Sequence, residues 1–344
     1  MQSRFLASRL VIAAAALLVT LGTAPAGNAA PSAADLHFPR YAHIFVLMDE
    51  NKSDGEIVNS PDAPAITAFA HAYGYASRFY AESHPSEPNY VALVGGSTYG
   101  IVDDAPHAID APSLATQFAG AGVSWKNYNE SLPKAGSLAA YATDPHPSDL
   151  PADLYVYAAK HSGFIEFTSV RRDPNRAGHI VGFDRLHADL HSGAVPAFSL
   201  IIPNLCNDMH GVGEGDSPPD CRNGHLLIRR GDRHVKSLVD EIMASPVWKQ
   251  PGNAAIVVTF DEDDADGAQG CCGTNPKDPA NAGGGHISTI VITNRGPRAV
   301  VDPTPYSHYS LLRTIDDAFG IHRYLQHAND AGVVPMTRLF APTR

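Results

Sequence analysis

Short hydrophobic runs alternate with amphipathic segments along most of the chain. Five runs predict buried strands: His43–Met48, Ser77–Ala81, Phe198–Ile202, Ala255–Phe260 and Ile287–Thr293. Segments with helical spacing lie between or after them: Ala63–Tyr73, Asn89–Gly95, Leu114–Ala121, Leu154–His161, Arg233–Ala244 and Tyr309–Phe319. Buried strands bounded by helices predict an α/β fold with a largely parallel central sheet and helices on both faces. Segments rich in glycine and proline at 103–112, 211–224 and 265–286 are expected to be surface loops.

The first 30 residues differ from the rest of the chain. Arg4 and Arg9 are accompanied by an apolar run, Leu10–Leu21, and by small residues that end at Ala30. This order is typical of a secretory signal peptide, and the run is shorter than the roughly 20 residues that a transmembrane helix needs. We therefore expect a secreted protein, extracellular or periplasmic, with one domain over residues 31–344.

Composition limits the class of partner. The formal net charge is −11, and removal of Arg4 and Arg9 with the signal peptide would make it −13. So acidic a surface argues against nucleic acid or anionic lipid as a tight partner. No later segment is apolar enough to predict stable membrane insertion, and the sequence predicts no particular oligomeric state. Phosphorylated substrates stay open, because a bound metal ion can dominate the local field.

Four cysteines fit an oxidising compartment: Cys206, Cys221, Cys271 and Cys272. No C-x-x-C spacing supports zinc ligation, so disulfides are favoured. Pairing Cys206 with Cys221 would leave two adjacent cysteines, which would form a vicinal bond or stay reduced. Pairing both across to Cys271 and Cys272 avoids that, and the sequence does not decide between the alternatives.

Polar residues follow four of the predicted strands. They are Asp49 to Asn51, then His84 and Ser86, then Asn204 to His210, and finally Asp261 to Asp264. In open α/β sheets, ligands bind beyond the carboxyl ends of the strands. One such ending would mean little, because Asp and Asn also cap helices. Four endings together predict a single site at this edge of the sheet.

The residue types at these strand ends indicate metal-assisted chemistry. Carboxylates with an amide oxygen favour Mg²⁺, Ca²⁺ or Mn²⁺, and Zn²⁺ if histidines join. Ser86 precedes Pro88, a residue suited to the first turn of a helix, so its hydroxyl would lie where a helix N-terminus attracts phosphate. Position alone leaves two roles for Ser86, a nucleophile or a simple helix cap.

Two further patterns bear on metal binding. The acidic run that begins at Glu262 resembles a calcium loop, but its twelfth position is Gly273, where a bidentate glutamate is required, so we reject that motif. Several histidines lie beside turns near predicted strand ends, where imidazoles can bind metal or phosphate or transfer a proton. A structural role is equally open for each one, and they are His84, His210, His286 and His308.

At this point the motifs resemble a known family. In chain order they are HIFVLMDENKS at 43–53, HPSEPNY at 84–90, IPNLCNDMHG at 202–211, VVTFDEDD at 257–264 and SHYSLLRTID at 307–316. The ordered set resembles the bacterial phosphoesterase family that contains phospholipases C and secreted acid phosphatases, within the alkaline phosphatase superfamily. The resemblance implies the three-layer sandwich of that superfamily and a hydrolase acting on phosphoric ester bonds.

The resemblance also implies roles for particular residues. Metal ligands would be Glu50, Asn51, Asp261 and Glu262. The segment from Ser86 to Asn89 is similar to a Thr-x-Pro-Asn nucleophile segment, which favours Ser86 as the nucleophile, with His210 or His308 assisting proton transfer. Asp208, His210 and His308 resemble residues of the superfamily's second metal or phosphate site, and His161 resembles a family active-site histidine. The remaining candidates for phosphate binding or a second metal are Asn89 and, from their positions beside turns, His84 and His286.

Two departures from the superfamily pattern shape the hypothesis. An Asp-His ending is replaced by Asp261 and Glu262, which questions a full two-metal centre. The chain also lacks the length of the phospholipases C. We therefore expect a metal-dependent phosphomonoesterase of the acid phosphatase type, acting on a phosphorylated small molecule or phospholipid through a phosphoserine intermediate. The alternatives are a phospholipase C-type phosphodiesterase that releases lipid headgroups and a metal- or surface-binding protein without activity.

Overall fold

The computed structural model describes residues 38–145, 150–213, 217–222, 224–264 and 267–341. The expected signal peptide, residues 1–30, lies outside the described residues. Within them, no helix is both long enough and apolar enough to span a lipid bilayer.

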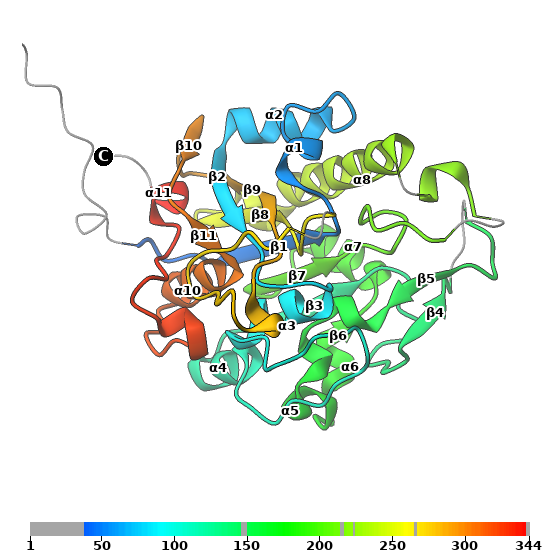
Figure 1. Ribbon diagram of the computed structural model, residues 1–344, viewed down its shortest axis with the longest axis horizontal. Helices are drawn as coiled ribbons and strands as arrows, with labels where there is room; N and C mark the ends of the chain where they lie inside the picture. The colour runs from blue at the N-terminus through cyan, green and yellow to red at the C-terminus, as the bar shows by residue number, and fades with distance from the viewer. Residues whose placement is uncertain (1–37, 146–149, 214–216, 223, 265–266, 342–344) are drawn as a thin grey trace, which may run out of the picture.

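A nine-stranded sheet forms the centre of the molecule (Figure 1). Its strand order is β10-β2-β9-β8-β1-β7-β3-β6, and β11 also pairs with β2. The strands are β1 (His43–Asp49), β2 (Gly74–Tyr80), β3 (Trp125–Asn129), β6 (Ile180–Val181), β7 (Phe198–Ile202), β8 (Ala254–Phe260), β9 (His286–Thr293), β10 (Val300–Asp302) and β11 (Tyr306–Ser307). A separate two-stranded sheet joins β4 (Tyr141–Thr143) to β5 (Tyr155–Ala158).

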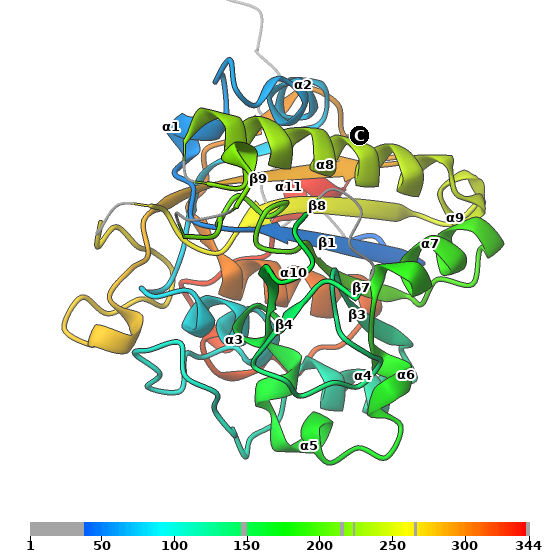
Figure 2. The ribbon, with the colours of Figure 1, turned by 90° about the vertical axis from the view of Figure 1, so that its right-hand side faces the viewer.

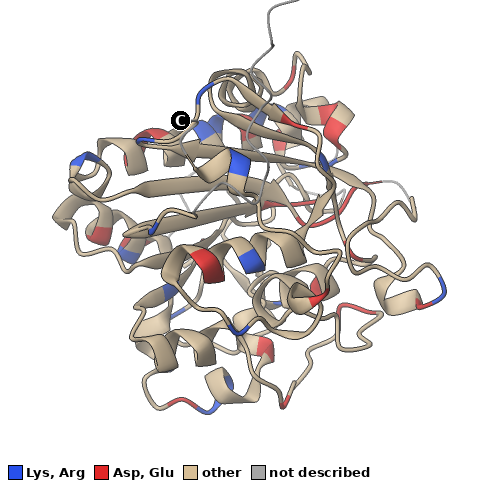
Figure 3. Ribbon diagram, turned by 90° about the vertical axis from the view of Figure 1, so that its left-hand side faces the viewer, with Lys and Arg blue, Asp and Glu red and all other residues tan. Residues whose placement is uncertain are grey.

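The central sheet is largely parallel, as the sequence predicts. β9 is the exception, because it runs antiparallel to both β2 and β8. The strands β7, β8 and β9 contain no Lys, Arg, Asp or Glu, and in Figure 3 charged residues lie mainly on helices and loops. Continuous hydrophobic strands of this kind are typical of a sheet that is buried on both faces.

The helices vary widely in length. The α-helices are α1 (Asp54–Ile57), α2 (Pro64–Ala72), α3 (Glu87–Gly95), α4 (Leu114–Ala121), α5 (Thr168–Arg171), α6 (Arg176–His179), α7 (Phe183–Ser192), α8 (His225–Ala244), α9 (Pro246–Lys249), α10 (His308–Phe319) and α11 (Thr337–Phe340). The 3₁₀ helices are η2 (Ala159–His161), η3 (Phe164–Glu166), η4 (Pro219–Cys221), η5 (Pro279–Asn281) and η6 (Gln326–Asn329).

Helices cover both faces of the sheet and complete a three-layer sandwich. Figure 2 shows α2 and α8 above the strands and α3, α4 and α10 below them. α8 buries Leu227, Val235, Leu238 and Ile242, a spacing that gives an amphipathic helix one apolar stripe. α10 ends at Gly320, whose φ of 72° is the left-handed conformation that glycine adopts without steric cost. The expected fold class is therefore confirmed.

One predicted helix is wrong. Residues 154–161 form strand β5 and the 3₁₀ helix η2 instead of an α-helix. Tyr155 is exposed while Val156 is buried, an inside-outside change between neighbours that suits a strand. The open question of cysteine pairing is also answered, because the structure joins Cys206 to Cys221 and Cys271 to Cys272.

Candidate active site

The register of two central strands brings the first group of site residues together. β1 and β8 are parallel neighbours, and their last residues, Asp49 and Phe260, are paired. Glu50 and Asp261 therefore leave the same edge of the sheet side by side. The backbone N–H of Asn51 donates to Asp261 Oδ1 over 2.9 Å, and Asn51 has a φ of 51°. Asn accepts this left-handed conformation more readily than most residues, and strained backbone of this kind is common at functional sites.

Ser86 stands directly before α3, as expected from Pro88, but its hydroxyl makes no capping hydrogen bond. Instead, Ser86 Oγ donates to Glu262 Oε1 over 2.9 Å and lies 3.3 Å from Glu50 Oε2. The side chain is buried. The hydroxyl therefore faces the carboxylates that follow β1 and β8 and does not satisfy the N-terminus of its own helix. The Ser86 hydroxyl therefore does not cap α3.

Two histidines approach Glu50 from other elements. His161 ends η2, and its Nε2 lies 2.6 Å from Glu50 Oε1. His210, in the loop after β7, places its Nε2 3.9 Å from Glu50 Oε2. His210 Nδ1 lies 2.6 Å from the carbonyl of Gly211, which can only accept, so Nδ1 carries the proton and Nε2 faces the site. The ligand atoms of Glu50, His161 and His210 all lie within 4.8 Å of one another and form a candidate metal site.

Charge interactions shift the acidity of this group. Burial raises the pKa of Glu50, but the charges on His161 and His210 outweigh it and lower that pKa overall. Burial likewise disfavours a charge on His161, yet the Glu50 carboxylate raises the pKa of His161 to about 9. Asp208, fully buried behind His161, has an oxygen 3.4 Å from His161 Nδ1. Asp208 thus faces Nδ1, on the side of the ring where carboxylates commonly stand behind histidines that bind metal.

The carboxylates at the sheet edge are poorly satisfied. Burial, Glu50 and Glu262 together raise the pKa of Asp261 well above its ordinary value. Among the described residues, Asp261 Oδ2 is buried without a hydrogen bond, and Glu50 Oε1 and His161 Nε2 face each other at 2.6 Å without meeting hydrogen-bond geometry. Buried polar atoms are normally paired, and a cation would relieve both the repulsion and the missing partners. The residues present therefore fit a divalent metal ion.

The other predicted site residues are placed differently. His84 Nδ1 contacts Glu262 Oε2, so His84 belongs to the group. The buried amide of Asn89 accepts from the backbone N–H groups of Glu82 and Ser83 and braces the turn before Ser86. His286 Nε2 lies 3.1 Å from the carbonyl of Ser77 on β2, away from the cluster.

His308 is fully buried at the start of α10, where both of its ring nitrogens are engaged. Nδ1 contacts Glu82 Oε2, and Nε2 donates to the carbonyl of Phe260 over 2.9 Å. This arrangement ties α10 to the end of β8 and leaves no ring nitrogen facing Ser86.

Two residues near Ser86 were not predicted. Lys160 precedes His161 on η2, and its Nζ lies 3.5 Å from Ser86 Oγ. Its other partner, Asp104, accepts from Nζ over 2.8 Å. Asp104 lies in a loop that was expected only to be at the surface. The adjacent Lys160 and His161 were visible in the sequence, but the expected α-helix gave no reason to direct the lysine toward Ser86.

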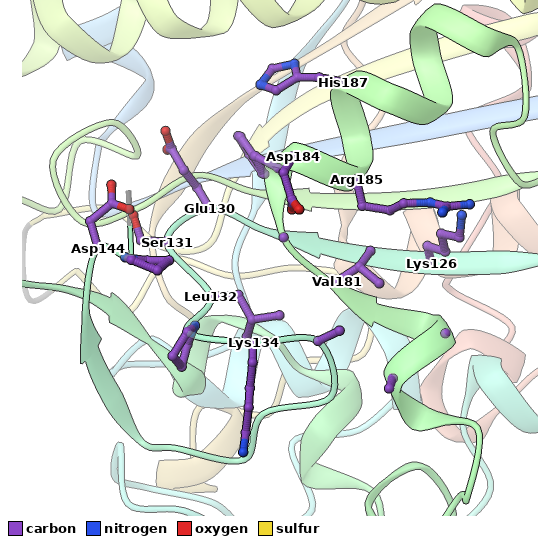
Figure 4. A pocket seen from close by; sticks show the side chains of 17 residues that line it. Lys126, Glu130, Ser131, Leu132, Lys134, Asp144, Val181, Asp184, Arg185 and His187 are labelled. Atoms are coloured by element: carbon purple, nitrogen blue, oxygen red, sulfur yellow. The ribbon is translucent and has the colours of Figure 1, made fainter. Parts of the chain in front are cut away.

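A cavity of about 770 Å³ opens beyond the carboxyl ends of β3 and β6. Figure 4 shows Glu130 on one side of it and Lys126 with Arg185 on the other. Glu130 accepts from the backbone N–H of Asn204 over 2.9 Å, in the loop that also carries Asp208. The cavity therefore borders the loop that supports the site, and none of the predicted site residues is among its lining residues.

Comparison with known proteins agrees with this geometry. The sequence profile of the Phosphoesterase family matches residues 56–322. A phosphatidylinositol-3-phosphatase from Mycobacterium tuberculosis is 27% identical over 315 residues, which cover 90% of this chain and 86% of the relative. An acid phosphatase from Aspergillus fumigatus is 26% identical over 252 residues, which cover 71% of this chain but 48% of that protein. The chain thus spans about half the length of the fungal relative.

Solved structures share the fold at low sequence identity. A protein of the alkaline phosphatase superfamily from Vibrio parahaemolyticus aligns with a TM-score of 0.53 and 11% identity, over 86% of this chain and 71% of that one. A sulfatase from Pseudoalteromonas sp. aligns with a TM-score of 0.51 and 13% identity, over 88% of this chain and 73% of that one. With the family profile covering most of the sequence, the chain belongs to the Phosphoesterase family and is a hydrolase that acts on phosphate esters.

Proposed function

We propose that this chain is a metal-dependent phosphomonoesterase of the acid phosphatase type in which Ser86 is the nucleophile. The observation that carries the proposal is the position of Ser86 Oγ, which lies before a helix N-terminus yet points at Glu262 and Glu50. The N–H groups at that helix end favour a phosphate in front of Ser86. The mycobacterial and Aspergillus relatives are named phosphatases, which favours a monoester substrate over a diester.

The hydrogen bond of Ser86 sets the direction of proton transfer. Its hydroxyl donates to Glu262 Oε1, so this carboxylate is positioned to receive the proton as Oγ bonds to phosphorus. The bond from phosphorus to the ester oxygen breaks, and the leaving oxygen keeps the electron pair and takes up a proton. His210 is the histidine we assign to that proton, because its Nε2 faces the site and its side chain is 29% exposed. Water then hydrolyses the phosphoserine.

The metal would be held at the same edge of the sheet. Glu50, Asn51, Asp261 and Glu262 are the ligands implied by the family, and His161 extends the set around Glu50, while His210 is kept for proton transfer. Mixed oxygen and imidazole donors favour Zn²⁺ or Mn²⁺ over Ca²⁺. A bound divalent cation would neutralise charge on the phosphoryl oxygens and lower the pKa of a coordinated hydroxyl.

The substrate and the cellular location are part of the same proposal. A phosphorylated small molecule or a phospholipid headgroup that carries a terminal phosphate would fit the chemistry. Export through the segment before residue 31 would place the enzyme outside the cytoplasm. The two disulfides agree with that location, because such bonds persist mainly in oxidising compartments.

Substitution of the nucleophile tests the mechanism. Ser86→Ala should abolish turnover of an aryl monophosphate while the fold and the metal content stay intact, and wild type quenched in acid should carry phosphate on Ser86 by mass spectrometry. Ser113 is a matched control, because it also stands directly before a helix, α4, and Ser113→Ala should keep its activity. Near-normal turnover by Ser86→Ala would remove Ser86 from this role.

Substrate class and metal need separate measurements. An aryl monophosphate, a bis-aryl phosphate and phosphatidylcholine should be compared with one enzyme preparation. Preference for either diester would overturn the monoesterase assignment in favour of the phospholipase C type. Elemental analysis, followed by chelation and return of single metals, should identify the ion that restores turnover, and full activity of metal-free protein would contradict the metal dependence.

A further inference from the structure

Lys160 is the cation that touches the reacting oxygen of Ser86. In the described part of the chain, the side chains that hydrogen-bond Ser86 Oγ are Glu262, Glu50 and Lys160. Two of these are carboxylates, and neither can stabilise negative charge on Oγ. Lys160 is cationic at neutral pH and offers three N–H donors on a compact ammonium.

The position of Lys160 is fixed by its surroundings. Its side chain is only 11% exposed, and its ammonium is anchored by Asp104 Oδ2 at 2.8 Å. Asp104 Oδ1 also accepts from the backbone N–H of Glu87 over 3.1 Å. Glu87 directly follows the nucleophile. One carboxylate therefore holds both the lysine and the backbone beside Ser86, which fixes their separation.

The alternative is a purely structural ion pair, and Lys126 shows what such a pair looks like. Lys126 is comparably buried, with a side chain 15% exposed, and it pairs with Asp189. Its ammonium also lies over the ring of Tyr128, and neither partner belongs to the candidate site. Lys160 differs from Lys126 because its ammonium donates to Ser86 Oγ in addition to pairing with Asp104.

We propose that Lys160 is a further catalytic residue that stabilises negative charge on Ser86 Oγ, with Asp104 as its positioning residue. This inference rests on the proposed function of Ser86. In the first step, the hydroxyl proton passes to Glu262 while Oγ bonds to phosphorus and the ester oxygen leaves with its electron pair. In the second step, water oxygen bonds to phosphorus and its proton passes to His210, which gave its own proton to the leaving oxygen. Oγ leaves with the electron pair of the broken bond and takes back the proton held by Glu262. Lys160 donates to Oγ in both steps, so one cation serves the nucleophile and the leaving group.

Steady-state kinetics of Lys160→Met test the assignment. We expect kcat for an aryl monophosphate to fall about 100-fold, the loss typical of removing one donor to a developing oxyanion. The metal content and the inhibition constant of inorganic phosphate should stay within about threefold of wild type, because the lysine is directed at Oγ. Lys126→Met is the matched control and should keep its activity.

Chemical rescue separates a catalytic cation from a structural one. In Lys160→Ala, added ethylammonium should restore part of kcat in a saturable way, whereas it should not activate wild type or Ser86→Ala. Asp104→Asn should lower kcat by about 10-fold, and in the Lys160→Met background it should have almost no additional effect, because both substitutions remove the same interaction.

Several results would overturn the assignment while leaving Ser86 as the nucleophile. Activity of Lys160→Met within about threefold of wild type would exclude an important role in either step. Equal losses in kcat/KM and in phosphate affinity would assign Lys160 to phosphate binding instead. Absence of rescue together with a loss of metal or of thermal stability would assign it to structure. Failure of the Ser86→Ala test, by contrast, would remove the proposed function itself.

Discussion

The negative charge of Asp261 should favour metal binding but destabilise the folded protein when no metal is bound. Its carboxylate is fully buried beside Glu50 and Glu262, and its Oδ2 has no hydrogen-bond partner in the part of the chain that the structure describes. Asp261→Asn keeps the acceptor for the Asn51 N–H but removes one negative charge. Metal affinity should fall by at least about 10-fold. Loss of a residue that only hydrogen-bonds a metal ligand already lowers affinity by that much, and Asp261 is proposed as a ligand itself. Without metal, the variant should be more stable than wild type by about 1 kcal/mol or more.

Both effects are measurable on one pair of proteins. Metal affinity comes from titration of metal-free protein, and stability from urea unfolding with chelator present. Addition of metal should reverse the order of stability, because ligand binding to the folded state stabilises wild type more. A metal-free variant that is less stable than wild type would contradict the idea that carboxylate repulsion is relieved by the ion.

Asp316, which is not one of the candidate site residues, should make the free energy of unfolding depend on pH. It is fully buried on α10, and burial raises its pKa to about 8 from the ordinary 3.8. The folded protein therefore keeps a proton that the unfolded chain releases, so the free energy of unfolding falls as pH rises between these values. Asp316→Asn resembles the protonated form. We expect wild type to lose up to about 1.4 kcal/mol per pH unit more than the variant in this window.

Urea unfolding at several pH values between about 5 and 7.5 checks this prediction, since this window lies inside the range where the unfolded carboxyl is ionised. Asp240 provides the control, because it is exposed on α8 and pairs with Lys236 four residues earlier on that helix. Asp240→Asn should keep the pH dependence of wild type. Parallel curves for wild type and Asp316→Asn would show that Asp316 ionises without cost in the folded state.

At the scale of elements, two helical glycines should respond oppositely to the same substitution. A methyl group at Gly120, on α4, would meet nothing within 4 Å, whereas one at Gly231, on α8, would lie 2.4 Å from Met209 Cγ and 3.1 Å from the carbonyl oxygen of Asn207. Gly120→Ala should stabilise the protein by about 0.5–1 kcal/mol. Gly231→Ala should destabilise it by about 1–3 kcal/mol through overpacking.

Gly231→Ala should also lower kcat, because the residues it displaces belong to the loop that carries Asp208 and His210. Unfolding and steady-state kinetics of the two variants give both readouts, and Gly120→Ala serves as the control with unchanged kcat. If Gly231→Ala kept both wild-type stability and wild-type kcat, α8 would not be what holds this loop in place.

Elements with an uninterrupted hydrophobic pattern were predictable from the sequence. Elements in which polar residues interrupt the apolar ones were missed or misplaced. β7 and β8 are continuous hydrophobic runs, and their predicted bounds agree with the structure to within one residue. β3 was missed because Lys126 and two asparagines interrupt its apolar residues. α8 starts at His225, eight residues before its predicted start, because the segment from Arg229 to Asp232 interrupts the apolar stripe that Leu227 and Ile228 begin. Local pattern fails where partners from distant segments supply the burial.

Among the residues of the candidate site, those that directly follow strands of the central sheet were predictable from the sequence, and Lys160 was not. Glu50, Ser86, Asp261 and Glu262 were placed correctly at one edge because each follows a strand, and parallel strands end together. Lys160 lies on η2 after a strand of the small second sheet, so no pattern in the central sheet locates it. Its approach to Ser86 depends on long-range packing that a single sequence does not encode as a local signal.

For the whole molecule, net charge should govern the approach of anionic substrates. The chain carries a formal charge of −11, while the cationic groups near Ser86 are buried: Lys160 is paired with Asp104, and His161 with Glu50. A phosphate dianion is therefore repelled at long range and attracted only at short range. Salt screens charges beyond about 8–10 Å at 0.10–0.15 M but affects buried pairs much less.

Raising the salt concentration should consequently improve catalysis on anionic surfaces. With a phosphomonoester lipid in vesicles rich in anionic lipid, kcat/KM should rise from about 0.01 M to 0.15 M salt as the Debye length contracts from about 30 to 8 Å. With the same lipid in zwitterionic vesicles the rise should be much smaller, because less surface charge opposes the protein. A fall in kcat/KM on the anionic vesicles would instead reveal a basic contact surface, since salt weakens attraction between opposite charges. The comparison therefore shows whether the acidic surface or a local basic face guides the enzyme to a membrane-bound phosphate.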